Sequence, residues 1–263
     1  MNLYEIVPGD SPLVIDIPHA GTYVPPAIAA RLTGAARTVP DTDWHVEKLY
    51  AFARRSGATL VIATHSRYVV DLNRDPDGVE LYPGADNTEM CPTRTFAGEA
   101  IYGEGDAPNA AQIEARRAEY FDPYHAMLAS ELERVRTRRG YVILLDGHSI
   151  RSRVPRFFEG RLPDLNLGTA DGASAAQGVE AVAASVLERA GAFTSVVNGR
   201  FKGGYVTRHY GRPREGIHAL QLEIAQASYM DEAFPYPWDE RRAAPLIALL
   251  QHLVAELARL VVA

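Results

Sequence analysis

The apolar residues of this chain are concentrated in short runs, and longer stretches of mixed polar and apolar residues separate these runs. The runs cover residues 12–17, 58–64, 68–72, 141–146, 194–198 and 219–225. Nearly continuous runs of valine, isoleucine and leucine are typical of strands that are covered on both faces. We therefore expect each run to be a strand of a buried sheet.

Four of the other stretches carry the signals of helices: residues 41–57, 109–139, 174–190 and 244–263. The first begins with acids and ends at Gly57, while Asn109 and Ser174 stand at the start of the next two. Strands that alternate with helices indicate an α/β protein, and we expect a three-layer sandwich with a central mixed sheet. In such folds functional residues gather at the strand ends.

Two Gly/Pro-rich segments, 73–108 and 151–172, show neither pattern. Long irregular segments inside a compact domain are more often functional than idle. Because the chain has no internal repeat and no linker composition, we expect residues 1–263 to form a single domain.

Composition narrows the classes of partner and of metal site. A net charge of −6 leaves no broad basic surface, which argues against a nucleic-acid partner. The N-terminus does not resemble a signal peptide and no apolar stretch is long enough for a membrane span, so we expect a cytoplasmic protein without a membrane partner. With Cys91 as the single cysteine, a metal site would have to use histidine, aspartate and glutamate. The oligomeric state has no signature in the sequence.

Polar residues follow the apolar runs at places where a sheet would bring them together. His19 follows the first run and His148 follows the fourth, while "DTDWH" places Asp41, Asp43 and His45 at the start of a predicted helix. Imidazole and carboxylate groups suit a catalytic zinc ion, which takes three protein ligands and keeps one position open. Two histidines and one of these acids would satisfy it.

Each of these residues also has an ordinary structural interpretation. A lone histidine after a strand is more often a hydrogen-bonded structural residue than a ligand. Asp41 or Asp43 could cap the helix that it begins, and His45 could face solvent. Asp146 is better suited to orienting a histidine ring or an amide than to binding a metal.

Glu223 interrupts an apolar run in "ALQLEIAQ", where Gln221 and Gln226 also occur. A buried carboxylate is costly unless it is paired, hydrogen-bonded or protonated. A general base beside a metal-activated water needs such a group. The alternative is an internal salt bridge to Arg67 or Arg208.

Two arginine-containing motifs indicate an acidic ligand. In "RYVVDLNRD", Arg67, Asn73 and Arg74 lie near a predicted strand end, and the planar guanidinium group matches a carboxylate. Local ion pairs within the turn are the alternative for Arg74. The segment "GRFKGGYVTRHYG" places Arg200, Lys202, Arg208 and His209 around a Gly-Gly turn. It could wrap an anion or form a solvated hairpin.

With these residues identified, the chain resembles the N-formylglutamate amidohydrolase family. The resemblance covers nearly the whole chain and rests on six motifs in order: "PHAGTYVP", "DTDWHVEKLY", "SRYVVDLNRDP", "LLDGHSI", "GRFKGGYVTRHYG" and "HALQLEIAQASYMDE". The family is distantly similar to the zinc carboxypeptidases and to the aspartoacylase and succinylglutamate desuccinylase group. This wider similarity implies a zinc-carboxypeptidase-like, phosphorylase/hydrolase-like fold.

The wider resemblance also implies roles for individual residues. His19 and His148 would be zinc ligands, Asn73 and Arg74 would bind a substrate carboxylate, and Glu223 would be the general base. Where the wider group has its ligand glutamate, this chain has Thr22, which cannot substitute. The third ligand is therefore expected from "DTDWH", and we favour Asp43 over His45 and Asp41.

The activity implied by the resemblance is hydrolysis of N-formyl-L-glutamate to formate and L-glutamate, a step of histidine degradation. The cofactor would be Zn²⁺ or another divalent transition metal, because histidine and carboxylate ligands suit several ions. Arg67 would assist Arg74, and Arg208, Lys202 or His209 would bind the second carboxylate of this small acidic N-acyl amino acid. The alternatives are a hydrolase of another N-acyl acidic amino acid and a non-catalytic metal- or ligand-binding protein of the same fold.

Overall fold

A computed structural model describes residues 1–262 and contains one sheet of 7 strands in the order β1-β3-β2-β4-β7-β5-β6. The four central strands β3, β2, β4 and β7 are parallel, whereas β1 and β5 pair antiparallel with β3 and β7. The outermost strand β6 is parallel to β5. The strands are β1 (Tyr4–Val7), β2 (Leu13–Ile17), β3 (Thr59–Ala63), β4 (Val142–Ile150), β5 (Leu165–Gly168), β6 (Ser195–Val197) and β7 (Ile217–Ala225).

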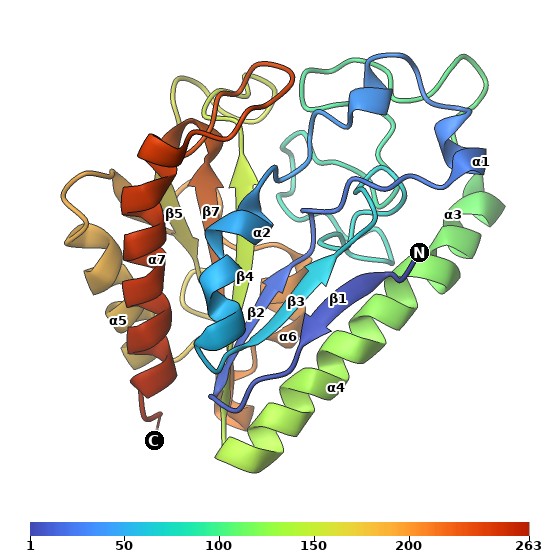
Figure 1. Cartoon of the computed structure of the whole chain (residues 1–263). Helices are drawn as coiled ribbons and strands as arrows, with labels where there is room; N and C mark the ends of the chain where they lie inside the picture. The colour runs from blue at the N-terminus through green and yellow to red at the C-terminus, as the bar shows by residue number, and fades with distance from the viewer. Residues whose placement is uncertain (263) are drawn as a thin grey trace.

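Helices cover both faces of this sheet, as Figure 1 shows. The α-helices are α1 (Pro26–Ala29), α2 (Val46–Leu49), α3 (Ala110–Arg116), α4 (Asp122–Arg139), α5 (Gln177–Glu188), α6 (Tyr205–Tyr210) and α7 (Glu240–Arg259). A π-helical turn (Arg117–Phe121) joins α3 to α4, and short 3₁₀ turns cover Ala36–Thr38, Ala51–Arg55, Pro213–Glu215 and Gln226–Ser228. Helices α2, α5 and α7 pack on one face, and α4 and α6 pack on the other. The predicted three-layer sandwich with a mixed sheet is confirmed.

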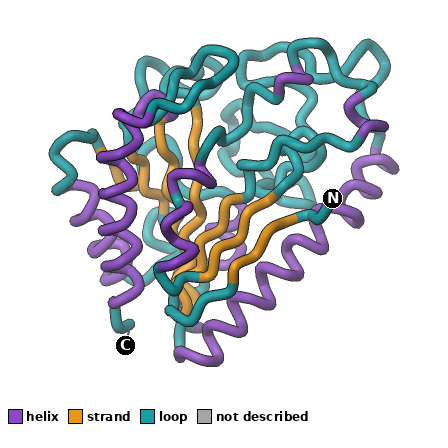
Figure 2. Tube along the Cα trace, in the orientation of Figure 1, coloured by secondary structure: helices purple, strands orange, loops and turns teal. Residues whose placement is uncertain are grey.

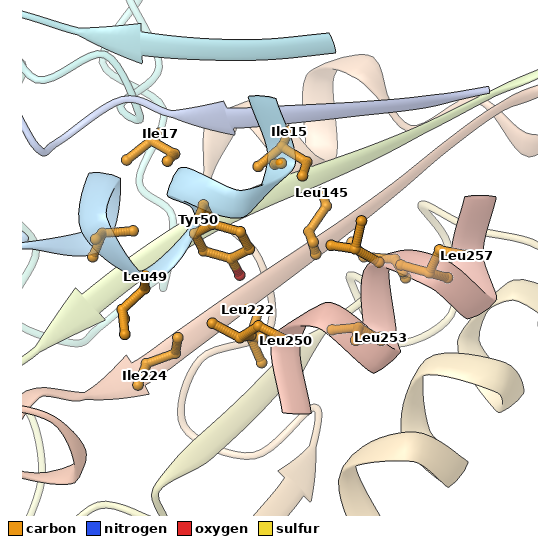
Figure 3. Close-up of a cluster of buried hydrophobic side chains, with 14 of the residues drawn as sticks. Ile15, Ile17, Leu49, Tyr50, Leu145, Leu222, Ile224, Leu250, Leu253 and Leu257 are labelled. Atoms are coloured by element: carbon orange, nitrogen blue, oxygen red, sulfur yellow. The ribbon is translucent and has the colours of Figure 1, made fainter. Parts of the chain in front are cut away.

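Side chains alternate between two apolar cores along the central strands. Ile15 and Leu145 pack under α7, together with Leu253 from the helix itself (Figure 3). Their neighbours Val14 and Leu144 face α4 instead. Because both faces are covered, apolar side chains occupy consecutive positions in these strands, which explains the continuous apolar runs in the sequence. Burial of so many aliphatic side chains is the main term that holds the layers together.

The strand predicted at residues 68–72 is wrong, because this segment is a turn followed by irregular chain. Its backbone groups bond to side chains and to other loops rather than to a strand. Arg116 donates to the carbonyl of Val69 (3.2 Å), and a ring nitrogen of His125 lies 2.9 Å from the carbonyl oxygen of Leu72. An apolar run can thus be buried without joining a sheet when side chains satisfy its polar groups.

The other differences concern element limits. The helix predicted at 41–57 is only α2 and a 3₁₀ turn, because His45 has a left-handed backbone (φ 64°) that interrupts a helix at this point. The segment 151–172, predicted to be irregular, contains β5, and the sequence patterns also did not indicate β1 and α6. The helix predicted at 244–263 begins earlier, at Glu240, after the cap residue Asp239, and ends at Arg259. The end of that prediction, Ala263, lies outside the described residues.

Loops gather at one end of the sheet, beyond the strands β4 and β7 in the upper part of Figure 2. They include most of the predicted irregular segments 73–108 and 151–172. Within residues 1–262, the helices are all too short or too polar to cross a membrane.

Candidate active site

The candidate site lies at the carboxyl ends of the parallel strands β2, β4 and β7. His19 comes two residues after the end of β2, and His148 on β4 stands in register with Glu223 on β7. Because side chains alternate along a strand, Asp146 shares a face with His148, and Gln221 shares one with Glu223. The fold therefore brings together polar residues that follow or interrupt three separate apolar runs.

Gly147 allows this arrangement by freeing space on the opposite face of β4. A Cβ atom at this position would lie 3.1 Å from the ring of Tyr50, which is fully buried in the core under α7. A side chain here would therefore push against the core while its neighbours Asp146 and His148 point to the site. The glycine in "LLDGHS" thus serves the packing of Tyr50.

His19, Asp43 and His148 form a buried group in which one ligand atom from each lies within 4.8 Å of the others. Oδ2 of Asp43 is 2.9 Å from Nδ1 of His148 and 3.8 Å from Nδ1 of His19. The backbone supports this contact, because the amide of Asp43 donates to the carbonyl of His19 (3.1 Å). Two imidazoles and a carboxylate are a common ligand set of catalytic divalent metals.

A second acid lies against the far nitrogen of each histidine. Nε2 of His19 is 2.8 Å from Oδ1 of Asp71, and Nε2 of His148 is 2.8 Å from Oδ1 of Asp146. Arg67 in turn holds Asp71, with Nη2 2.7 Å from Oδ2. Carboxylates that orient histidine rings in this way are typical of metal-binding histidines.

The electrostatics of this group favour a positive charge at its centre. Nδ1 of His19 and Oδ1 of Asp43 are buried without a hydrogen-bond partner in the part of the chain that the structure describes. Burial disfavours a charged imidazole, but Asp146 and Asp43 outweigh it and raise the pKa of His148 well above its usual value. Burial also opposes ionisation of Asp71, yet Arg67 and His19 hold the pKa of this carboxyl well below its usual range. A cation with open positions for nitrogen and oxygen fits these residues.

The other two candidate residues of "DTDWH" lie elsewhere. Asp41 accepts hydrogen bonds from the hydroxyl of Tyr68 (2.6 Å) and the amide of Phe96 (2.9 Å). The ring of His45 points to the loop before α7, with Nε2 2.8 Å from the carbonyl oxygen of Tyr236. Of the three residues considered from this motif, Asp43 alone joins the two histidines.

Glu223 is buried in β7 and lines the same cavity as the histidines. Its Oε2 accepts a hydrogen bond from the side chain of Gln221 (3.2 Å). Burial and the nearby Asp43 raise its pKa to about 8, although His148 and Arg67 act in the opposite direction. No arginine among residues 1–262 forms an ion pair with it, so neither Arg67 nor Arg208 makes the salt bridge considered as an alternative.

Asn73 is a support of the site, buried beneath His148. Its Nδ2 lies 2.9 Å from Nε2 of His148, and its Oδ1 accepts from the amide of Val206 at the start of α6 (2.8 Å). A Cβ atom on Gly204 would lie 2.4 Å from the side-chain amide of Asn73, so only glycine allows the chain to pass so close to it. The Gly-Gly turn of the sequence thus lets α6 pack against the site.

A cavity opens onto these residues. Glu223, His19 and His148 line it together with the arginines Arg67, Arg74 and Arg200, and further lining comes from Leu81, Tyr82, Thr88, Phe96, Phe157 and Phe201. Much of this lining belongs to the long loops 73–108 and 151–172. These two segments therefore supply much of the cavity wall.

The sequence-predicted cations are distributed unequally around this cavity. Arg67 and Arg74 line it, while Arg208 and His209 are exposed and line a neighbouring pocket that shares Asn73 and Arg74 with it. Lys202 lies outside both pockets, with Nζ 3.0 Å from Asp171. The assignment of these residues to substrate binding stays a prediction.

Two residues of the quoted motifs were not among the residues assigned to metal or substrate binding, and both have clear positions in the structure. Asp71 orients His19, and Arg200 lines the cavity. Arg67 and Asp71 are four positions apart in the sequence, and this spacing could have identified Asp71 as an acid paired with an arginine. Arg200 differs little in sequence context from Lys202, and only the course of the loop separates them.

Comparisons with known proteins identify the family of the chain. The family model described as N-formylglutamate amidohydrolase matches residues 11–230. Curated relatives named N-formylglutamate deformylase, from Pseudomonas aeruginosa and Pseudomonas putida, are 46% and 45% identical over 249 residues. Each alignment covers 95% of this chain and 93% of the relative.

Solved structures give the same relationship. The chain is similar to the N-formylglutamate amidohydrolase from Ralstonia eutropha JMP134, with a TM-score of 0.82, 28% identity, and coverage of 98% of this chain and 97% of the other. The gene product Atu2144 from Agrobacterium tumefaciens shares the fold, with a TM-score of 0.76 at 16% identity over 98% of this chain and 95% of its own. By the extent of these matches, the chain belongs to the N-formylglutamate amidohydrolase family.

Proposed function

We propose that this protein hydrolyses N-formyl-L-glutamate to formate and L-glutamate. The observation that carries the proposal is the buried group of His19, Asp43 and His148, which faces a cavity shared with Glu223 and three arginines. The names of the relatives support the same reaction. Its place in histidine degradation and a cytoplasmic location remain predictions.

We infer that the buried group holds a divalent metal ion, with zinc as the first choice. Two imidazoles and one carboxylate fit a catalytic zinc. Nδ1 of His19 and Oδ1 of Asp43, which have no hydrogen-bond partner, are the kinds of atom that such an ion binds. When bound, the ion supplies Lewis acidity, which polarises a carbonyl group and makes a water molecule more acidic. Iron, cobalt or manganese would suit the same ligands.

Glu223 is the proposed general base. Its carboxylate accepts a proton from the attacking water and later donates this proton to the nitrogen of the leaving glutamate. Because Glu223 is buried, its carboxyl can hold this proton between the two steps without losing it to bulk solvent. Gln221 donates to Oε2 and limits the positions that the carboxylate can take.

Substrate binding is assigned to Arg74, which lines the cavity. Its Nε donates to the side chain and the carbonyl of Thr88 (2.8 and 3.2 Å), and Nη1 donates to the carbonyl of Asn73 (2.8 Å). These bonds fix the guanidinium plane, so a carboxylate can bind without ordering a flexible side chain. Asn73 and Arg67 support this site, the first through His148 and the second through Asp71.

The test is formate release from a panel of N-acyl amino acids, with and without a chelator, after the metal content of the protein has been measured. We expect N-formyl-L-glutamate to be the best substrate and the chelator to abolish its hydrolysis. A higher rate with formyl- or acetyl-aspartate would favour a different acidic substrate. Metal binding without turnover of the whole panel would contradict the enzymatic function and favour a binding protein.

A further inference from the structure

Three arginines line the cavity, and they differ in how their charges are compensated. Arg67 is already paired, with Nη2 2.7 Å from Asp71 and Nη1 3.5 Å from Asp43. Among residues 1–262, no carboxylate forms an ion pair with Arg74 or Arg200. The cavity therefore offers a ligand two guanidinium groups that have no ion-pair partner.

Arg200 is held in place by neutral groups. Its Nε donates to the carbonyl of Phe157 (2.7 Å), and its guanidinium carbon lies 4.8 Å from the ring centre of Tyr82 and 5.4 Å from that of Phe201. Its terminal nitrogens donate no hydrogen bond to another described residue. Stacking on aromatic rings orients a guanidinium group without neutralising it, so its terminal nitrogens remain available for a carboxylate.

Arg74 and Arg200 belong to different parts of the cavity wall. Arg74 directly follows Asn73, whose side chain contacts His148 at the reacting end. Arg200 is hydrogen-bonded to Phe157 of the segment 151–172 and packs on Tyr82 of the segment 73–108. A ligand with two carboxylates would have one cation of this cavity for each.

We propose that Arg200 binds the side-chain carboxylate of the substrate and thereby selects acidic N-acyl amino acids. The inference rests on the proposed function, in which Arg74 holds the carboxylate beside the amide. It also replaces the candidates drawn from the sequence. Lys202 is paired with Asp171, and Arg208 and His209 line the neighbouring pocket.

The first test compares N-formyl-L-glutamate with N-formyl-L-glutamine, which has the same shape but a neutral side chain. Arg200→Gln should lower kcat/KM for N-formylglutamate about 100-fold, mainly through KM, because a hydrogen-bonded charge pair is lost. The same variant should leave the low rate with N-formylglutamine nearly unchanged. Arg200→Lys should recover part of the preference, since it restores the charge but not the planar fork.

Arg153→Gln is the matched control, because Arg153 is an exposed arginine in the same loop as Phe157 that does not line the cavity. It should keep the wild-type preference. Equal losses on both substrates in Arg200→Gln would show a merely structural role and overturn the inference. Loss of the preference in Arg208→Gln, with Arg200→Gln unaffected, would also overturn it.

A binding measurement separates this inference from the proposed function. Calorimetric titration of the metal-loaded protein with glutarate and with its monoamide should show tighter binding of glutarate, and Arg200→Gln should remove the difference. If the wild type releases no formate but shows this pattern, the proposed function fails and the role of Arg200 stands. If the wild type is active and Arg200→Gln still prefers glutarate, only the role of Arg200 fails.

Discussion

Two regions of the molecule bury histidines and surround them with opposite kinds of partner. At the carboxyl ends of β2 and β4, His19 and His148 share Asp43, and each has a further acid at its other nitrogen. Between α4 and α6, Nδ1 of His125 lies 2.9 Å from the hydroxyl of Tyr210 and Nε2 lies 2.9 Å from the carbonyl oxygen of Leu72. All three rings are buried, so burial does not distinguish the regions.

The difference shows what separates a structural histidine from a candidate ligand. His125 has a neutral partner at each nitrogen, and burial lowers its pKa to about 4, so the ring stays uncharged and is fully satisfied. The ring of His19 keeps an Nδ1 without a hydrogen-bond partner, 3.8 Å from Oδ2 of Asp43. Several buried acids around an incompletely bonded imidazole favour added positive charge, which a bound metal ion would supply.

We call the surroundings of His19 and His148 the acidic region and those of His125 the neutral region. The largest expected effect on activity comes from removing a histidine of the acidic region. His148→Ala should lose the metal and reduce formate release to the level of the chelator-treated protein, because one of three ligands is removed. His125→Gln is the matched control in the neutral region and should keep both metal and activity. The prediction would be contradicted if His148→Ala kept its activity while His125→Gln lost activity at full metal content.

A nearly equal loss of activity, with a different cause, is expected at Glu223. Glu223→Gln keeps the shape of the side chain but removes the base, so kcat should fall about 10⁴-fold. The metal content should stay at the wild-type level, since Glu223 is not in the buried group of ligands. Turnover at the wild-type rate in this variant would contradict the proposed mechanism.

A smaller effect is expected from the acid that orients His148. Asp146→Asn should weaken metal affinity about 10- to 100-fold, as measured by competition with a chelator of known affinity. The fold of this variant should survive. Burial is the main cause of the raised pKa of the neighbouring Asp16, the charge of Asp146 adds to it, and the substitution removes this repulsion. Unchanged metal affinity would mean that Asp146 does not orient the ring.

His125, the histidine of the neutral region, should make the stability of the protein depend on pH. The pKa of His125 is lower in the folded protein, about 4, than in the unfolded chain, about 6.5, so the unfolded chain binds the proton first as the pH falls. Stability is therefore lost between about pH 6.5 and pH 4, and His125 should account for roughly 2 kcal/mol of this loss at pH 5. Urea unfolding at pH 7 and pH 5 should show a smaller pH dependence for metal-free His125→Gln than for the metal-free wild type. An equal loss of stability between pH 7 and pH 5 in the two proteins would be evidence against a neutral, buried His125.

The sequence was sufficient where a physical pattern repeats along the chain. Continuous apolar runs predicted the buried strands, and parallel strands bring the residues that follow them to one edge. This is why the sequence alone groups His19, His148 and Glu223. The same reasoning failed for residues 68–72, where side chains such as Arg116 and His125 satisfy the backbone in place of a neighbouring strand.

Local signals could not separate residues that lie close together in irregular chain. Asp43 and His45 are two positions apart, and the left-handed backbone at His45 turns its ring away from the site. Arg200 and Lys202 are likewise separated by one residue, yet Arg200 lines the cavity and Lys202 pairs with Asp171. Without a helix or strand period to fix directions, only the fold decides which side chain reaches the site.

The central claim is that the acidic region, and not the neutral one, holds a metal ion. Metal content per chain, measured on wild type, His148→Ala and His125→Gln purified in parallel, tests it most directly. The account predicts about one divalent ion per chain in the wild type and in His125→Gln, and almost none in His148→Ala. Wild-type metal content in His148→Ala would contradict it.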